Sequence, residues 1–403
     1  MSSFASMPPP RVLLVRYGEL ALKGGNRTEF ELTLMRNIRS ACADVAPVRV
    51  EREHGRLFVF ADERMESVAR RLTQVFGISS VSPAWEAPSE PDAICGVARG
   101  VLEDALAAQP AGARPPFRVL SRRVDKRFPL TSMQLDRYVA EHILRVDDPL
   151  EVELEHPELV LGIEVREKTS YLFARRIAGP GGLPVSSLGR VLCLISGGID
   201  SPVAAWMAMK RGALCSFVTF HSHPYIGDEA KDKVVELVRV LSRWQPRSRL
   251  FVAPFAAAQV ALRGAATNGY EDGYRTVLYR RMMQRIASAI ADAEGAKALI
   301  TGECMGQVAS QTLENLACIG AAAQLPVLRP LIAFDKQETV DIAQRIGTFA
   351  LSAVQTPDCC TLFMPRRAVT RGRLEVCEEI ESRLDVPALV ADSVARAERI
   401  DVA

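Results

Sequence analysis

A glycine turn between an apolar run and a helical segment constrains this chain more than any other feature. The apolar run 191–195 precedes Ser-Gly-Gly-Ile-Asp-Ser at 196–201, and a helix-forming stretch begins at Pro202. Proline suits the first helical turn, because its missing N–H has no helical partner there. Glycines let the backbone approach a ligand closely, and a helix N-terminus favours an anion. The sequence therefore predicts strand, turn and helix around a phosphate or pyrophosphate, with Asp200 near a metal ion that neutralises the same phosphates.

From residue 190 onward, segments typical of strands alternate with segments typical of helices. The expected strands are 190–195, 214–221, 249–253, 298–302 and 327–332, and the expected helices are 202–211, 229–244, 274–294, 307–318 and 336–346. Such alternation predicts a parallel sheet covered by helices on both faces. Ligands bind at the carboxyl ends of parallel strands, which is where the glycine turn falls.

Two smaller units are expected before this region. Strands at 11–17, 48–50 and 57–60 and helices at 27–42 and 65–75 match the size of a ferredoxin-like α+β unit. A second unit is expected to contain helices 94–108 and 132–144 and strands 117–121, 150–155, 159–166 and 169–174. The stretch with Gly77, Pro83 and 88–91 is interpreted as a connection, and 179–184 as a second seam. We therefore predict an α/β protein of three domains, at 1–75, 76–176 and 177–403.

Length and composition limit the function classes. The chain has 403 residues, 48% of them hydrophobic, and a formal net charge of only +2. An anionic partner must then be met by a local basic patch. We expect no membrane span and no signal peptide, because no apolar run is long enough and the first ten residues lack a basic region. The nine cysteines show no spacing typical of a disulfide scaffold, so we expect reduced thiols and a cytoplasmic location.

Several longer motifs carry a resemblance to a known family. The hexapeptide 196–201 resembles the pyrophosphate loop of ATP pyrophosphatases, which split ATP into AMP and pyrophosphate. The other motifs are Arg-Tyr-Gly-Glu-Leu-Ala-Leu-Lys-Gly-Gly-Asn-Arg at 16–27, Tyr-Arg-Arg-Met-Met-Gln-Arg at 279–285, 302–316, Arg-Pro-Leu-Ile-Ala-Phe-Asp-Lys at 329–336 and Pro-Asp-Cys-Cys-Thr-Leu-Phe at 357–363. Together, over nearly the whole chain, they resemble the tRNA 4-thiouridine synthase family. That resemblance implies a ferredoxin-like domain and a THUMP domain that hold tRNA, followed by a Rossmann-like ATP pyrophosphatase (PP-loop) domain.

The resemblance also implies the ATP contacts. They fall on Leu194, Ile195, Ser196, Gly197, Gly198, Ser201, Thr219, Phe220, Arg280, Gly302 and Gln311. Thr219 stands where the family would have a histidine, so its contact is expected through the backbone or to be weaker. Asp200 is expected to act in catalysis and to hold Mg²⁺ through the phosphates. Gln307, Ser310 and Gln311 are expected on a helix after the strand that ends at Gly302. Taken alone, the arginines 280, 281 and 285 favour a solvated basic face.

Thiolation needs a nucleophile that can hold a terminal persulfide. The resemblance aligns the family's catalytic cysteine with Cys360, which is therefore the expected sulfur carrier. Its neighbour Cys359 is either structural or a resolving thiol. The simpler alternative for both is a pair of buried thiols. An iron–sulfur cluster is a further alternative, formed with Cys193, Cys215, Cys304 and Cys318, but the sequence contains no C-x-x-C motif.

A basic segment lies within the THUMP-like region. Arg122, Lys126 and Arg127 are interleaved with Phe117 and Phe128. Runs of charge are usually solvated faces. In a unit that resembles a THUMP domain, however, we predict contact with RNA phosphates.

The resemblance implies an ATP-dependent tRNA sulfurtransferase that adenylates the C4 oxygen of uridine 8 and replaces it with sulfur. The base must leave its stack to react. The implied partners are tRNA, a cysteine desulfurase as sulfur donor, a thiamine-pathway sulfur carrier protein as second acceptor, and a second copy of the chain in a homodimer. Because the sequence stops at Ala403, we expect a short form without a rhodanese-like domain. The alternatives are another PP-loop tRNA-modifying enzyme, for 2-thiolation or lysidine synthesis, and a tRNA-binding factor without catalysis.

Overall fold

A computed structural model describes residues 9–19, 25–53, 55–110, 113–145, 148, 150–356, 362–365 and 367–402. The chain divides into two compact units, Met1–Gly182 and Leu183–Ala403. Each unit has its own sheet and its own core.

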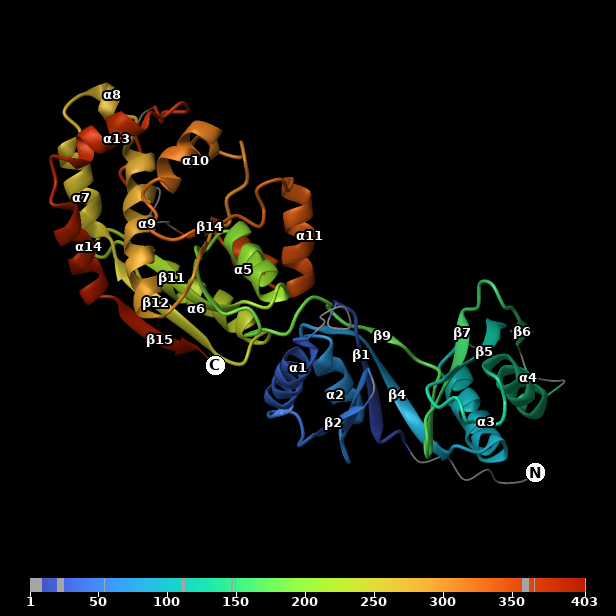
Figure 1. Ribbon diagram of the computed structural model, residues 1–403. Helices are drawn as coiled ribbons and strands as arrows, with labels where there is room; N and C mark the ends of the chain where they lie inside the picture. Colours follow the sequence, from blue (N-terminus) through green and yellow to red (C-terminus); the bar gives the residue numbers. More distant parts are fainter. Residues whose placement is uncertain are drawn as a thin grey trace. The chain divides into compact units, whose positions relative to one another are not determined.

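The first unit is built on one continuous sheet (Figure 1). Its strands are β1 (Val12–Tyr17), β2 (Arg49–Glu53), β3 (Arg56–Phe60), β4 (Ile78–Pro88), β5 (Pro116–Arg123), β6 (Glu151–Val152), β7 (Leu159–Val165), β8 (Thr169–Phe173) and β9 (Ile177–Ala178). Its helices are α1 (Arg27–Cys42), α2 (Met65–Leu72), α3 (Pro91–Ala107) and α4 (Ser132–Ile143). The strand order is β2-β3-β1-β4-β8-β7-β5-β6, with β9 beside β4.

Strand β4 corrects one expectation, since most of the supposed connection around Pro83 is an 11-residue strand. Residues from Ile78 to Ala84 pair with β1, and residues from Trp85 to Pro88 pair with β8. Pro83 therefore lies next to the point where β4 changes partner. The order β1-α1-β2-β3-α2-β4 is that of a ferredoxin-like fold, and its last strand carries the sheet into the following THUMP-like part. The boundaries at 75 and 176 stay predictions.

The second unit is a parallel sheet covered on both faces, as predicted. Its strands are β10 (Arg190–Leu194), β11 (Leu214–His221), β12 (Ser248–Pro254), β13 (Leu299–Ile300), β14 (Val327–Leu328) and β15 (Glu398–Val402). Its helices are α5 (Asp200–Lys210), α6 (Glu229–Ser242), α7 (Ala256–Ala265), α8 (Gly269–Asp272), α9 (Arg275–Ala293), α10 (Leu313–Gly320), α11 (Lys336–Ile346), α12 (Phe349–Ala353), α13 (Leu374–Glu381) and α14 (Val386–Ala395), with a 3-10 turn at Ala309–Gln311. The strand order is β14-β13-β10-β11-β12-β15, all parallel except β15.

Helices α5, α6, α11 and α12 pack together on one face of this sheet, and α7, α9, α13 and α14 pack together on the other (Figure 1). The core on the second side gathers around α9, whose Met282, Ile286 and Ile290 are buried. Helix α11 begins with a capping box, which the spacing of Asp335-Lys-Gln-Glu338 in the sequence predicts. Asp335 accepts from the Glu338 amide, and Glu338 accepts from the Asp335 amide. The helix ends at Gly347, whose φ of 81° lies in the left-handed region.

Two expectations about this unit were wrong. No single helix runs from 307 to 318: a 3-10 turn comes first, and α10 starts at Leu313, because the Thr312 side chain caps it by accepting from the Asn315 amide. The last expected strand was 327–332, but β15 near the end of the chain also joins the sheet, where it pairs antiparallel with the edge strand β12.

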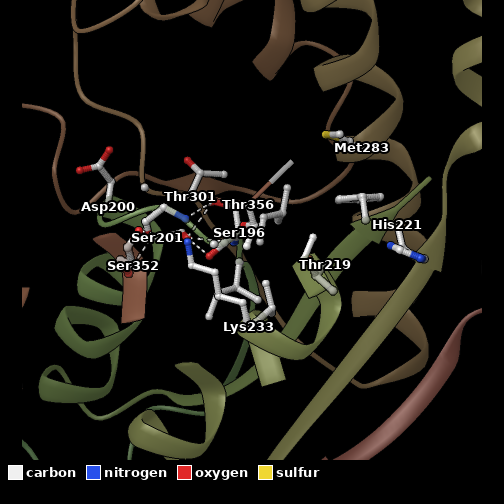
Figure 2. Close-up of a pocket in the computed structure, with 18 of the residues that line it drawn as sticks. Ser196, Asp200, Ser201, Thr219, His221, Lys233, Met283, Thr301, Ser352 and Thr356 are labelled. Atoms are coloured by element: carbon white, nitrogen blue, oxygen red, sulfur yellow. Dashed lines mark hydrogen bonds between the residues drawn. The ribbon is translucent and has the colours of Figure 1, made fainter. Parts of the chain in front are cut away.

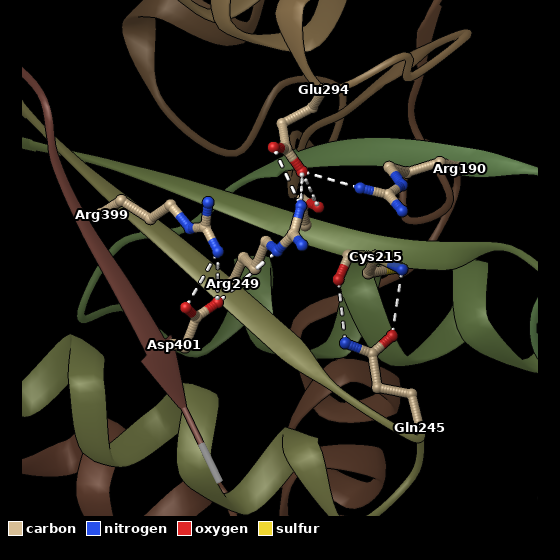
Figure 3. A network of polar contacts seen from close by, with 8 residues as sticks. Arg190, Cys215, Gln245, Arg249, Glu294, Arg399 and Asp401 are labelled. Atoms are coloured by element: carbon tan, nitrogen blue, oxygen red, sulfur yellow. Dashed lines mark hydrogen bonds and ion pairs between the residues drawn. The ribbon is translucent and has the colours of Figure 1, made fainter.

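The amino ends of the strands hold structural ion pairs (Figure 3). Glu294, just after α9, accepts from Arg190 of β10 at 2.8 Å and from Arg249 of β12 at 3.2 Å. Arg249 also lies 3.5 Å from Asp401 of β15. Gln245 exchanges two hydrogen bonds with the backbone of Cys215. These contacts fix the amino ends of the sheet, and the glycine turn lies at the opposite, carboxyl end of β10.

Candidate active site

The glycine turn is closed by its own serines. The Ser196 amide donates to Oγ of Ser201 at 2.9 Å, and the Gly198 amide donates to Oγ of Ser196 at 3.3 Å. Helix α5 starts at Asp200, two residues before the predicted start, and no side chain caps it from Ile199. The first amides of α5 and its positive dipole end therefore suit an anion.

A cavity of about 580 Å³ opens over this turn (Figure 2). The structure brings every residue predicted to contact ATP to its wall, together with Asp200. These residues are Leu194, Ile195, Ser196, Gly197, Gly198, Ser201, Thr219, Phe220, Arg280, Gly302 and Gln311. They come together because the carboxyl ends of β10, β11 and β13 meet at one edge of the sheet. Their assignment as nucleotide ligands stays a prediction.

Gly302 allows the chain after β13 to touch the turn. A Cβ atom on this residue would lie 2.6 Å from the Ser201 amide nitrogen and 2.8 Å from Ser201 Cα. Both are backbone atoms, so neither can move aside without shifting the start of α5. Glycine is therefore required here for close approach.

We expect Gly302→Ala to weaken ATP binding about tenfold or more, because overpacking of this kind costs about 1–3 kcal/mol. Isothermal titration with ATP measures the change. Gly264→Ala is the matched control: a Cβ there meets nothing within 4 Å, so ATP affinity should stay at the wild-type value. Equal ATP affinity in the Gly302→Ala protein would contradict this account of the contact.

Arg280 is held at the cavity by a buried carboxylate. Its Nη1 donates to Oε1 of Glu303 at 3.0 Å, while Arg329 donates to Oε2 of the same residue at 2.7 Å. Thr301 donates to Glu303 as well, at 2.9 Å. Glu303 is only 5% exposed and lines the cavity, although the sequence did not single it out. It orients the guanidinium of Arg280 toward the ligand space.

The other two arginines of α9 do not form a solvated basic face. Arg281 is 2% exposed and makes two hydrogen bonds to Glu381 of α13, at 2.9 and 2.8 Å. Arg285 makes two more to the same carboxylate, at 2.7 and 2.8 Å. The expectation fails because a carboxylate distant in sequence lies opposite this face of the helix. These two arginines are structural.

Two polar side chains of the cavity wall, Gln311 and His221, lie where they can contact a bound ligand. Gln311 is 6% exposed, and within the described part of the chain its Oε1 atom accepts no hydrogen bond. His221 closes β11 two residues after Thr219, with Nε2 at 3.3 Å from Oδ1 of Asp228. Burial is the main cause that lowers the pKa of His221. The ring is therefore mostly neutral near pH 7. Its role was missed because a single histidine at the end of a strand carries no ligand pattern of its own.

Asp200 has two partners that the sequence did not pair with it. Nζ of Lys336 lies 2.7 Å from its Oδ1 atom, and Nε2 of Gln307 lies 3.2 Å from its Oδ2 atom. Lys336 comes from the start of α11 and belongs to the motif at 329–336. The carboxylate is thus held at the edge of the cavity by a cation from another helix.

Cys359 and Cys360 lie outside the described residues. Of the other cysteines, Cys193, Cys215 and Cys318 are buried. Burial raises the pKa of Cys193 and Cys318 above the ordinary value. In the described ranges no group of three or more His, Cys, Asp and Glu side chains is arranged to hold a metal ion. Burial and a raised pKa make Cys193 and Cys318 poor nucleophiles.

The residues predicted to contact RNA differ in how free they are to bind a phosphate. Arg127 is paired with Asp125 at 3.0 Å and with Glu167 at 2.9 Å. Lys126 and Arg122 are exposed. Arg122 also lines a second cavity, of about 930 Å³, whose wall the sequence did not predict. The other residues around it are Tyr17, Arg27, Thr28, Glu31, Arg52, Glu53, Gly55 and Arg56. The basic surface thus includes arginines from the ferredoxin-like part.

None of the helices within the described ranges is both long and apolar enough to cross a membrane.

Comparison with known proteins assigns the chain to a family. Residues 186–386 match the family model described as thiamine biosynthesis protein (ThiI), 12–82 match the ThiI ferredoxin-like domain, and 90–175 match the THUMP domain. A probable tRNA sulfurtransferase of Moorella thermoacetica is 45% identical over 390 residues, which is 97% of each chain. Another from Brevibacillus brevis is 43% identical, over 96% of this chain and 95% of its own.

A solved structure supports the same family assignment. The crystal structure of a 4-thiouridine synthetase–RNA complex with bound ATP superposes with a TM-score of 0.89 at 34% identity, covering 98% of this chain and 100% of the other. The order of domains, the cavity over the glycine turn and the match along almost the entire length lead to one conclusion: the chain belongs to the ThiI family of tRNA sulfurtransferases.

Proposed function

We propose that this enzyme uses ATP to replace the C4 oxygen of uridine 8 in tRNA with sulfur, giving 4-thiouridine. The observation that carries the proposal is the cavity over the glycine turn, whose wall combines an uncapped helix N-terminus with Arg280 and Gln311. Membership of the family and the similarity to a synthetase solved with RNA and ATP support it.

The cavity fits ATP. The amides of the turn and the start of α5 face the phosphates, and Arg280 adds a positive charge fixed by Glu303. The Oε1 atom of Gln311 is a buried acceptor whose partner the described residues do not supply, and an amino group of the ligand would satisfy it. Buried polar atoms without a partner are costly, so this one favours a bound ligand.

Asp200 is the proposed Mg²⁺ residue. Magnesium is usually held by one or two carboxylates together with substrate phosphates, and Asp200 lies at the start of α5 beside the turn. The ion would neutralise charge on the phosphates. Lys336, 2.7 Å from Asp200, is a second positive group at the same edge of the cavity. We propose that Lys336 stabilises the negative charge that develops as pyrophosphate leaves, and that Asp200 would contribute through the Mg²⁺ that it holds.

The proposed chemistry has two halves. The uridine C4 oxygen attacks the α-phosphorus, the bond to pyrophosphate breaks, and the base becomes an adenylate. The terminal sulfur of a Cys360 persulfide then attacks C4, and AMP leaves with the former C4 oxygen. A second thiol cleaves the resulting disulfide link, which leaves the sulfur on the base and a disulfide on the protein.

The remaining parts of the proposal concern partners. Arg122, Lys126 and Arg127, with the arginines of the second cavity, are proposed to contact tRNA phosphates. A cysteine desulfurase is proposed as sulfur donor, and the description of the family as a thiamine biosynthesis protein supports a sulfur carrier protein as second acceptor. We also propose a homodimer that works in the cytoplasm, where tRNA and reduced thiols are found.

Nucleoside analysis of tRNA incubated with the protein, ATP, Mg²⁺, a cysteine desulfurase and excess cysteine, which also reduces the protein disulfide, tests the proposed function. We expect 4-thiouridine at position 8 only when all components are present. Asp200→Asn keeps the shape of the side chain but removes its charge, and the rate should fall about 100-fold or more, the scale for loss of one transition-state contact. Formation of 2-thiouridine, or of no thiolated nucleoside, would rule the proposal out.

A further inference from the structure

Lys233 connects two parts of the active site that are far apart in sequence. It belongs to α6 and reaches toward the glycine turn (Figure 2). Its Nζ atom donates to the backbone oxygens of Ser352 at 3.1 Å and Val354 at 2.5 Å. Ser352 is in α12, and Val354 is the first residue after that helix. The ammonium therefore satisfies carbonyl groups that the helix leaves without a partner.

The stem of the same side chain lies against Gly197. A Cβ atom on Gly197 would be 3.2 Å from Cδ of Lys233 and 3.3 Å from Nζ. The φ angle of Gly197 is outside the left-handed region, so its backbone conformation does not require glycine. A side chain at position 197 would occupy the space that Lys233 fills.

A second contact joins α12 to the turn. Oγ of Ser352 donates to the backbone oxygen of Gly198 at 3.3 Å. The end of α12 is therefore attached to the turn both directly and through Lys233. Beyond it, Gln355 and Thr356 line the same cavity as the turn. The sequence then reaches Cys359 and Cys360, three and four residues after Thr356.

The other lysine of α6 does not share this role. Lys231 lies 3.5 Å from Asp228 and 3.9 Å from Glu398, which are carboxylates of the surrounding surface. Lys233 is partly buried as well, but its Nζ atom donates to two backbone oxygens of the α12 end. These two hydrogen bonds fix the position of that backbone.

We propose that Lys233 is a positioning residue for sulfur transfer. It holds the end of α12 on the glycine turn, and so sets Gln355 and Thr356, which precede the cysteine pair in the sequence, relative to that turn. This inference rests on the proposed function. It predicts that loss of the ammonium uncouples the two halves of the reaction: the adenylate still forms, but water consumes it before sulfur arrives.

The test compares two products of one reaction. Wild type and Lys233→Met are incubated with tRNA, ATP, Mg²⁺, cysteine and a cysteine desulfurase, and pyrophosphate and 4-thiouridine are both quantified. In the variant, we expect the amount of 4-thiouridine per pyrophosphate to fall about tenfold to a hundredfold, the scale for misplaced reacting groups. Lys233→Arg keeps the charge and should restore much of the ratio. If Lys233→Met is insoluble, the ratio of 4-thiouridine to pyrophosphate is measured in Lys233→Gln instead, which also lacks the charge.

Arg239→Met is the matched control. Arg239 is on the same helix, is half-exposed and pairs with Glu236, so its loss should leave the ratio unchanged. A proportional fall of both products in Lys233→Met, or no change in either, would overturn the inference. If the wild type makes pyrophosphate but no 4-thiouridine, the proposed function itself fails, which is a different result.

Discussion

Cys360→Ser should abolish 4-thiouridine formation while leaving tRNA-dependent pyrophosphate release near the wild-type rate. A serine hydroxyl cannot carry a persulfide, and loss of a covalent nucleophile costs about 10³-fold or more. Adenylation should survive, because the cavity residues that we assign to ATP belong to other segments of the chain. Measuring both products with a cysteine desulfurase as sulfur source separates the two steps.

Cys359→Ser is the matched control for this prediction, since it makes the same chemical change one residue earlier. It should keep most of the 4-thiouridine yield. The reverse pattern, with loss in Cys359→Ser and activity in Cys360→Ser, would move the sulfur carrier to Cys359. Full activity in both variants would show that neither thiol carries the sulfur.

Glu381→Gln should cause a large loss of stability of the catalytic unit. The Glu381 side chain is 6% exposed and accepts four hydrogen bonds from Arg281 and Arg285. Removing its charge leaves a buried guanidinium without a counter-ion, and breaking a buried pair in this way costs about 3–5 kcal/mol. Urea unfolding measures the free-energy change. Glu379→Gln on the same helix is the control, because its pair with Arg383 is exposed and contributes about 1 kcal/mol or less.

The pH dependence of the unfolding free energy gives a second test of the pairing between Glu381 and its two arginines. Burial alone would raise the pKa of Glu381, but hydrogen bonds and charge from Arg281 and Arg285 lower it overall. A lowered pKa means that the pair stabilises the fold above the ordinary glutamate pKa of about 4.3, and that this contribution is lost as the pH falls through the folded value. The difference in stability between wild type and Glu381→Gln should therefore shrink in acid. A difference that stays constant with pH would contradict the assignment.

What the sequence predicted well was local in the chain. The hexapeptide 196–201 contains both the serines whose hydrogen bonds close the turn and the first residues of the helix. The strand ends around it converge because a parallel sheet brings them to one edge. The capping box of α11 is likewise contained in four residues. The turn and the capping box can be read from sequence because their partners are near neighbours, and the convergence of the strand ends follows from the general geometry of parallel sheets.

What the sequence missed depends on distant partners. Arg281 looks like part of a basic helix face until Glu381, 100 residues later, is seen to neutralise it. Lys233 binds backbone oxygens more than a hundred residues away, and a backbone oxygen leaves no pattern in a sequence. Gly77 and Pro83 are turn-forming residues, so the sequence around β4 suggested a connection. Only the sheet shows that β4 changes its partner strand next to Pro83, which allows a proline within the strand.

We propose that the cavity over the glycine turn activates the base by adenylating its C4 oxygen. The most direct measurement uses tRNA whose target uridine carries ¹⁸O at C4, incubated with the enzyme, ATP, Mg²⁺ and a sulfur source. Because AMP leaves with that oxygen, mass spectrometry should find one ¹⁸O atom in AMP for each 4-thiouridine formed. If 4-thiouridine forms and the AMP contains no ¹⁸O, the uridine oxygen is not the group that ATP activates, and the claim is wrong.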